Sequence, residues 1–342
     1  MTSDSSFQDD LGGLPTPNVN LNLAKSFGPL RVLSLTGGGF RGLFTARTLV
    51  TVCAQARHTG PLDKSFDVFA GTSIGGLMAC ALSVGVLPHR VLDAIDAEGA
   101  TIFEPRKATT MRRALFGTLY DEGHLSKAID ACLGKRGATR MCDLDKGLII
   151  PTVDWVNGQV KVLLSGFFGA AHASEATLKE VCLATSAAPT YFKPGEIDGL
   201  PMLDGGLSVN NPDMLALTQI MTRRPGLMPN VEMLSIGTAG YSAPRSADKA
   251  ERWGVGWLQD LPSFMMTVQE RSAALQAQQL LDDRYLRLNH AGEPIEAFMK
   301  LDHASSQARD RLWAAADETA KLAYATNPAF IDRMFSPLRA AP

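Results

Sequence analysis

The sequence predicts an α/β protein in which a mainly parallel sheet is covered by helices. Two observations support this fold class. Short apolar runs that end at glycine-rich turns alternate with stretches of helical periodicity. In addition, 31 of the 342 residues are glycine, above the usual share of about 7%, which indicates tight turns or close backbone approaches. The length leaves room for a large core in one or two domains.

The first third of the chain carries the clearest alternation. Its expected elements are a strand at 31–36, a helix at 42–57, a strand at 66–70 and a helix at 75–86. Residues 68–87 contain no charged residue and are long enough to span a membrane. Four glycines and several hydroxyl side chains interrupt this stretch, so a buried strand, a tight turn and a core helix explain it better.

The remaining elements follow from the same patterns. They are a largely helical stretch at 89–145, strands at 147–153 and 160–165, a helix at 175–186, a segment at 201–203 that leads into Asp204-Gly205-Gly206, a helix at 212–221, strands at 231–236 and 285–288, and helices at 253–283 and 304–325. The Asn157-Gly158 pair predicts a hairpin turn. Because no repeat or linker divides the chain, we expect one domain over 29–342, with a motif-bearing core at about 30–240 and a helical extension at about 241–342.

Composition narrows the class of protein. There are 33 basic and 35 acidic residues, a net charge of −2, which argues against a surface built for DNA or RNA. Residues 1–28 show no sustained periodicity and no signal-peptide pattern, so we expect a flexible tail. The five cysteines form no C-x-x-C pair, which predicts reduced thiols in a cytoplasmic protein and no zinc site.

The segment Gly71-Thr72-Ser73-Ile74-Gly75 matches G-x-S-x-G between an expected strand and an expected helix. This context is typical of a nucleophile elbow, a strained turn that exposes the serine hydroxyl. The helix that follows points its N-terminus at the same place and favours a developing oxyanion. The simpler alternative is a serine in an ordinary glycine-rich turn. The flanking elements favour Ser73 as a nucleophile.

The loop Gly37-Gly38-Gly39-Phe40-Arg41-Gly42 also follows a strand and opens a helix. It fits the dinucleotide fingerprint G-x-G-x-x-G, which requires an acidic residue about 20 positions later, at the end of the next strand. Position 57 is an arginine, and Asp67 stands at the start of that strand. An oxyanion hole, in which bare backbone N–H groups face a tetrahedral intermediate, fits better beside a serine elbow. Arg41 would add positive charge there or hold the loop, unless it is a plain surface arginine.

A serine nucleophile needs a base, and none of the histidines stands in a glycine-rich loop at a strand end. They are His58, His89, His124, His172, His290 and His303. Asp204, in Leu203-Asp204-Gly205-Gly206, does stand in such a loop. A carboxylate within hydrogen-bond distance of a serine hydroxyl can act as its base without an imidazole. A turn aspartate is the alternative.

Taken together, these motifs resemble the three sequence blocks of the patatin-like phospholipases. The blocks are G-G-G-x-R-G at 37–42, G-T-S-I-G at 71–75 and D-G-G at 204–206, with similar flanking segments at 184–192 and 210–212. The resemblance covers roughly residues 30–240 and implies a three-layer α/β/α sandwich. It also implies a membrane phospholipid ester as substrate and no metal or cofactor. The implied site comprises the nucleophile Ser73, the base Asp204, an oxyanion site of Gly37, Gly38, Gly39 and Arg41, and the motif glycines Gly42, Gly71, Gly75, Gly205 and Gly206.

A narrower resemblance, carried by the segment 33–43, is to the phospholipase effectors of bacterial anti-phage signalling. It implies activation by a cyclic dinucleotide and action at the inner face of the cell membrane by a peripheral, cytoplasmic enzyme. No known motif places the nucleotide pocket, and generic bacterial patatin-like lipases resemble the chain as well. An oligomer is compatible with the sequence.

Two other functions use the same motifs differently. An α/β-hydrolase would pair Ser73 with His290 or His303 in a Ser–His–Asp triad, whereas a nucleotide-binding regulator would hold phosphates in the glycine loop and leave the serine inert.

Two further features also have two readings. The apolar stretch 253–266 is either a lipid-facing cap or, more commonly for such stretches, packed core. Arg106, Lys107, Arg112 and Arg113 would meet phosphate on a lipid headgroup or a cyclic dinucleotide, unless they form a solvated face.

Overall fold

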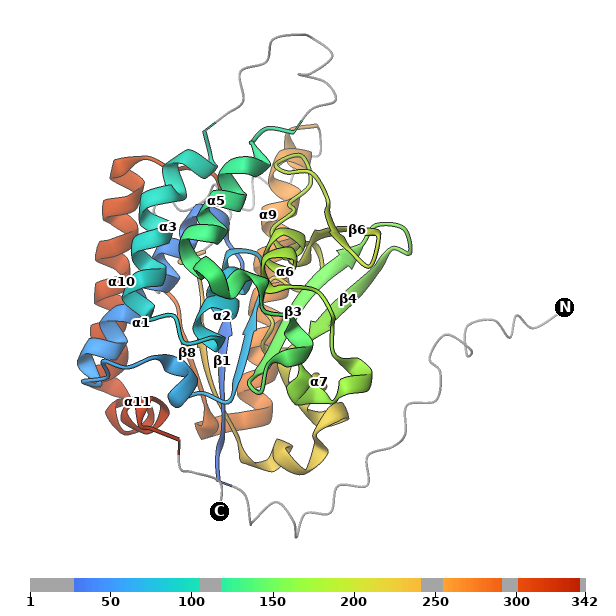
Figure 1. The fold of residues 1–342 in the computed structure, drawn as a ribbon. Helices are drawn as coiled ribbons and strands as arrows, with labels where there is room; N and C mark the ends of the chain where they lie inside the picture. The colour runs from blue at the N-terminus through green and yellow to red at the C-terminus, as the bar shows by residue number, and fades with distance from the viewer. Residues whose placement is uncertain (1–27, 105–117, 241–254, 291–300, 339–342) are drawn as a thin grey trace, which may run out of the picture.

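The computed structural model describes residues 28–104, 118–240, 255–290 and 301–338, and for 255–263 it describes the backbone alone. Residues 1–27 of the expected tail and the basic cluster at 106–113 lie outside the described residues. Within these limits the chain forms a central sheet flanked by helices (Figure 1).

The sheet contains eight strands. They are β1 (Leu30–Leu35), β2 (Val68–Gly71), β3 (Gly147–Asp154), β4 (Gln159–Leu164), β5 (Gly195–Ile197), β6 (Leu200–Asp204), β7 (Val231–Ile236) and β8 (Tyr285–Leu288). Their order is β5-β6-β3-β2-β1-β7-β8, and β4 pairs with β3. Strands β3, β2, β1, β7 and β8 are parallel to one another, whereas β4, β5 and β6 pair antiparallel with their neighbours. The carboxyl ends of the parallel strands therefore meet at one edge, where ligands bind in open α/β sheets.

Strand β3 brings two distant segments together along one of its edges. β2 pairs in parallel with its first half, up to Ile149, and β6 pairs antiparallel with its second half, from Thr152 onward. Because β4 occupies the opposite edge of β3, β2 and β6 run toward each other on the same edge. Their carboxyl ends, at Gly71 and Asp204, are level with β3 residues two positions apart, a separation of about 7 Å.

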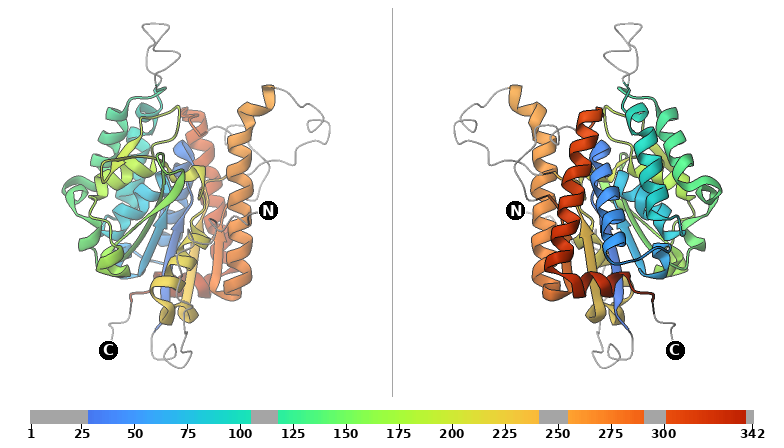
Figure 2. Two further views of the ribbon diagram at one scale, coloured as in Figure 1. Left: turned by 90° about the vertical axis from the view of Figure 1, so that its right-hand side faces the viewer. Right: turned by 90° about the vertical axis from the view of Figure 1, so that its left-hand side faces the viewer.

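Helices cover both faces of the sheet. The longer helices are α1 (Gly42–Gln55), α2 (Ile74–Ser83), α3 (Pro88–Ile102), α5 (Glu122–Leu133), α6 (Leu178–Thr185), α7 (Asp213–Arg223), α9 (Val255–Leu281), α10 (Ser306–Thr326) and α11 (Pro328–Phe335). Alternate β1 residues feed two cores: Leu33 and Leu35 join the core under α1 and α2, and Leu30 and Val32 join the core under α7 and α9. Figure 2 shows α5 and α9 on opposite sides of the sheet. The predicted three-layer sandwich is confirmed.

The expected elements agree with this structure apart from their ends and three omissions. Sequence patterns miss the three-residue strand β5, the five-residue strand β6 and the eight-residue helix α11. The expected extension contributes β8, which pairs with β7 and extends the parallel sheet. The uncharged stretch 68–87 splits into β2 and the ten-residue α2, and no described helix is long and apolar enough to cross a membrane.

Candidate active site

Ser73 occupies a strained turn between β2 and α2. Its φ of 55° and ψ of −125° put a non-glycine residue in a region that costs roughly 1–3 kcal/mol. The Thr185 hydroxyl at the end of α6 accepts a hydrogen bond from the Ser73 amide (3.1 Å) and donates to the Pro151 carbonyl (2.8 Å). This pair of bonds ties the turn to β3 and holds the serine in its strained conformation.

The turn lies directly against the end of β1. A side chain at Gly75 would meet the carbonyl oxygens of Leu35 and Thr36, so only glycine permits this approach. Gly71 has no space for a side chain beside the first turn of α2, and Gly42 has none beside Ile74. The motif glycines of both loops therefore allow the β1 loop and the serine turn to touch.

Asp204 ends β6 and is 7% exposed. The Gly206 amide donates to its Oδ1 (2.7 Å), and Gly205 packs against the Pro151 carbonyl where a side chain would not fit. Burial raises the pKa of Asp204 from its usual 3.8 to about 6, and hydrogen bonds from Gly206 and from the Ser73 side chain oppose that rise. A carboxylate with this pKa is charged at pH 7 yet basic enough to accept a proton from a nucleophile.

The loop after β1 presents backbone donors to the same space. Gly39 has a φ of +57°, and the Phe40 amide donates to the Leu301 carbonyl (2.8 Å). Among the described residues, the amides of Gly38 and Gly39 have no acceptor, and both residues line the pocket that contains Ser73. Such free donors suit an oxyanion.

Arg41 lies behind this loop and is absent from the pocket lining. Its amide (3.2 Å) and its Nε (3.4 Å) both donate to the Gly38 carbonyl oxygen. The Gly38 carbonyl and the Gly39 N–H belong to one trans peptide and point in opposite directions. The two hydrogen bonds to the carbonyl therefore direct the Gly39 amide away from Arg41. Of the two roles expected for Arg41, the geometry favours holding the loop over placing charge at the reacting atoms.

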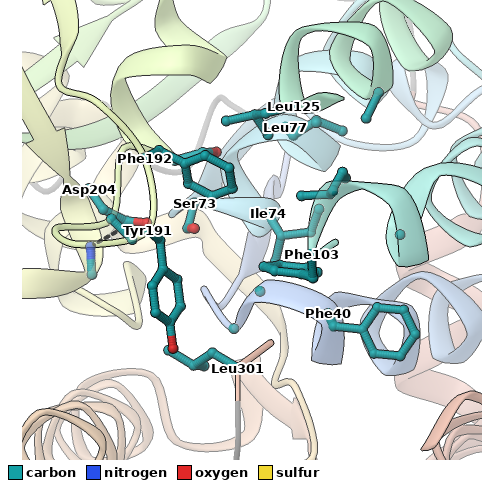
Figure 3. A pocket seen from close by; sticks show the side chains of 18 of the residues that line it. Phe40, Ser73, Ile74, Leu77, Phe103, Leu125, Tyr191, Phe192, Asp204 and Leu301 are labelled. Carbon is teal, nitrogen blue, oxygen red and sulfur yellow. Dashed lines mark hydrogen bonds between the residues drawn. The ribbon is translucent and has the colours of Figure 1, made fainter. Parts of the chain in front are cut away.

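An apolar pocket opens from Ser73 and Asp204, and both side chains stand at its wall (Figure 3). The start of α2, the helix α3 with the residue that follows it, and the helix α5 all contribute apolar side chains to its lining. These residues are Ile74, Leu77, Ile95, Ile102, Phe103, Leu125 and Ala128, with Phe40, Tyr191, Phe192, Met266 and Leu301 from other segments. The pocket thus joins a polar reacting end to a long hydrocarbon surface, the chemistry of a fatty acyl chain.

A buried ionic network, which the sequence patterns do not reveal, supports the site from the α9 side. Arg287 of β8 donates to Glu270 of α9 (2.6 Å) and to Thr36 (3.2 Å), directly before the glycine loop. It also lies 3.7 Å from Asp213, which accepts hydrogen bonds from Ser235. Because charged partners this far apart in sequence follow no local pattern, no sequence signal would identify them.

Several sequence candidates lie away from this pocket. None of the six histidines lines it; His303 instead contacts Ser305, and His58 contacts two backbone carbonyls. A Ser–His–Asp triad would require an imidazole beside Ser73, and no histidine belongs to the lining of this pocket. Asp67 accepts a hydrogen bond from the Arg31 amide at the opposite end of β2, which removes the acidic partner of a dinucleotide site.

The apolar stretch 253–266 is described in part. Residues 253 and 254 and the side chains to position 263 lie outside the described part of the chain. Met266 lines the pocket, whereas Met265 is 58% exposed. The expectation of packed core is therefore wrong at Met265.

Comparison with known proteins agrees with this architecture. A family model described as patatin-like phospholipase matches residues 33–217, more than half of the chain. The chain is similar to proteins named cGAMP-activated phospholipase. One from Escherichia coli is 30% identical, covering 91% of this chain and 94% of the relative. Those from Pseudomonas aeruginosa (90% and 91%) and Vibrio cholerae (91% and 96%) are each 29% identical. The chain therefore belongs to the patatin-like phospholipase family, and it is a hydrolase of carboxylic ester bonds.

Proposed function

We propose that Ser73 and Asp204 form the catalytic dyad of a phospholipid acyl hydrolase. The observation that carries this proposal is the convergence of three groups in one apolar pocket. These groups are a serine on a strained turn, a buried carboxylate that contacts it, and the amides of Gly38 and Gly39, which find no acceptor among the described residues. No histidine takes part.

The proposed reaction follows from this geometry. Asp204 accepts the hydroxyl proton while Ser73 attacks the ester carbonyl carbon, and the glycine amides stabilise the oxyanion that forms. Collapse of the tetrahedral intermediate releases the lysolipid alcohol, which takes up the proton from Asp204. Water, deprotonated by Asp204, then attacks the acyl-enzyme carbonyl carbon. The fatty acid leaves, and Asp204 returns the proton to the Ser73 oxygen.

The exposed surface beside the pocket supports peripheral contact with a membrane. Leu207, 52% exposed, stands at the pocket, and Met265 and Val268 are 58% and 50% exposed on the neighbouring part of α9. Large apolar side chains in such positions favour the interface between water and lipid. We place the enzyme in the cytoplasm, acting at the inner face of the cell membrane.

The names of the relatives support activation of the enzyme by a nucleotide. Because proteins of similar length and 29–30% identity are named cGAMP-activated phospholipases, we infer that a cyclic dinucleotide activates this chain. Such an enzyme would destroy the membrane of its own cell during antiviral defence.

Hydrolysis of phospholipid vesicles, with and without a panel of cyclic dinucleotides, tests both the catalytic dyad and the activation by a nucleotide. We expect fatty acid release by the wild type with one of these nucleotides, none with Ser73→Ala, and full release by the exposed control Ser272→Ala. Full activity in Ser73→Ala would overturn the dyad. Equal wild-type activity without nucleotide would overturn the activation by a nucleotide and leave the hydrolase assignment standing.

A further inference from the structure

Asn210 carries a buried amide with no hydrogen-bond partner. The residue is 1% exposed, and neither its Oδ1 nor its Nδ2 is bonded to any group that the structure describes. A buried polar group left without a partner costs roughly 1–3 kcal/mol, and native proteins contain few of them. An apolar side chain of the same size would be cheaper here, so the amide needs an explanation.

Its position is at the reacting centre. Asn210 lines the same pocket as Ser73 and Asp204. Its backbone carbonyl accepts a hydrogen bond from the Gly37 amide (2.9 Å), and its Oδ1 would lie 2.6 Å from a Cβ built on Gly37 and 3.1 Å from one built on Gly206. The amide therefore stands between the glycine loop and the loop that carries Asp204.

The next residue shows that the surroundings do provide partners where the fold requires them. Asn211 is equally buried, and its Nδ2 donates to Asp213 Oδ2 (2.9 Å) and to the Glu270 carbonyl (3.3 Å). Its Oδ1 accepts from the Asp213 amide (3.2 Å). Of two adjacent asparagines, one is bonded at both ends of its amide within the protein. The other belongs to the pocket lining and has both ends of its amide unbonded within the described part of the chain.

We propose that the Asn210 amide is bonded by the substrate: its Nδ2 donates to the ester oxygen on which negative charge develops. It thereby becomes a third donor beside the amides of Gly38 and Gly39. No bond is made or broken at Asn210, which acts through a hydrogen bond that strengthens in the transition state. This inference rests on the dyad proposed above.

The test compares Asn210→Ala with Asn211→Ala by two measurements. The first is kcat and KM for phospholipid vesicles under the conditions in which the wild type is active, together with the rate at which a fluorophosphonate modifies Ser73. The second is the free energy of unfolding in urea. For Asn210→Ala we expect kcat and the labelling rate to fall about 100-fold, the lower range for loss of one oxyanion donor. We expect KM to change little and stability to stay equal or rise, because an unpaired polar group is removed.

Asn211→Ala should behave in the opposite way and lose stability, because it strips partners from buried groups. The inference is overturned if Asn210→Ala keeps kcat within threefold of the wild type, or if its loss of kcat is accompanied by a loss of stability like that of Asn211→Ala. Asn210→Leu provides a second measurement if the alanine variant folds poorly. Activity in Ser73→Ala would refute the dyad, whereas an inactive Ser73→Ala with a fully active Asn210→Ala would refute only the role of Asn210.

Discussion

Replacing Asp204 by asparagine is expected to stabilise the protein while abolishing its activity. The substitution keeps the shape of the side chain and an oxygen that can accept the Gly206 amide, and it removes the negative charge. That charge is unfavourable in the folded state, because burial raises the pKa of Asp204 from 3.8 to about 6. No nearby cation compensates it among the groups that shift this pKa.

The magnitude follows from linkage between protonation and folding. A carboxyl whose pKa is higher in the folded chain contributes full stability below pH 3.8, and that contribution disappears as the pH rises through about 6. The difference between these two pKa values corresponds to about 3 kcal/mol. The uncharged asparagine side chain has no such dependence. We therefore expect the Asp204→Asn variant to gain up to about 3 kcal/mol over the wild type at pH 8 and about half of that at pH 5.

Urea unfolding of both proteins at several pH values between 5 and 8 measures this difference. The same pKa predicts that wild-type hydrolysis declines below pH about 6, as the base becomes protonated. A variant that is no more stable than the wild type at pH 8, or a gain that does not change with pH, would refute the claim that Asp204 is held as a desolvated base.

Two other substitutions test the surroundings of the site. Arg287→Met leaves Glu270 and Asp213 buried without their cation, so it should lower the free energy of unfolding by about 3–5 kcal/mol. A loss below about 1 kcal/mol in urea unfolding would contradict a stabilising role for this ionic network. Met265→Glu should reduce hydrolysis of vesicles several-fold but not of a soluble short-chain ester, whereas Leu322→Glu, equally exposed on α10, should leave both unchanged. Equal vesicle activity in the two glutamate variants would refute membrane contact through α9.

Sequence patterns predict the parts of this fold that depend on local order. The strand, tight turn and helix around Ser73 are all visible because alternating apolar runs and glycines lie within a few residues of one another. The short elements β5 and α11 are missed because three and eight residues carry too little periodicity.

The contact partners of the site residues cannot be predicted from local sequence patterns. Thr185 and Asn210 contact the loops at Ser73 and Gly37 across more than 100 residues of chain. Likewise, Asp204 reaches Ser73 only because β6 enters the edge of β3 that β2 leaves unpaired. A motif can suggest that these residues belong together, but the antiparallel pairing of β6 with β3 is what brings Asp204 to Ser73.

Three departures from ordinary local rules occur at the site. Ser73 holds a strained backbone, Asp204 is buried as a desolvated carboxyl, and Asn210 is buried with an unpaired amide. Each departure is unfavourable by a few kcal/mol, and all three lie in one pocket. Single departures also occur elsewhere in the described chain, such as the positive φ of Asp198 and the unpaired Nε1 of Trp313. At the site, three departures of different kinds share one pocket, as expected of groups that await the same ligand. Their coincidence in one pocket supports a functional site there without reference to any family resemblance.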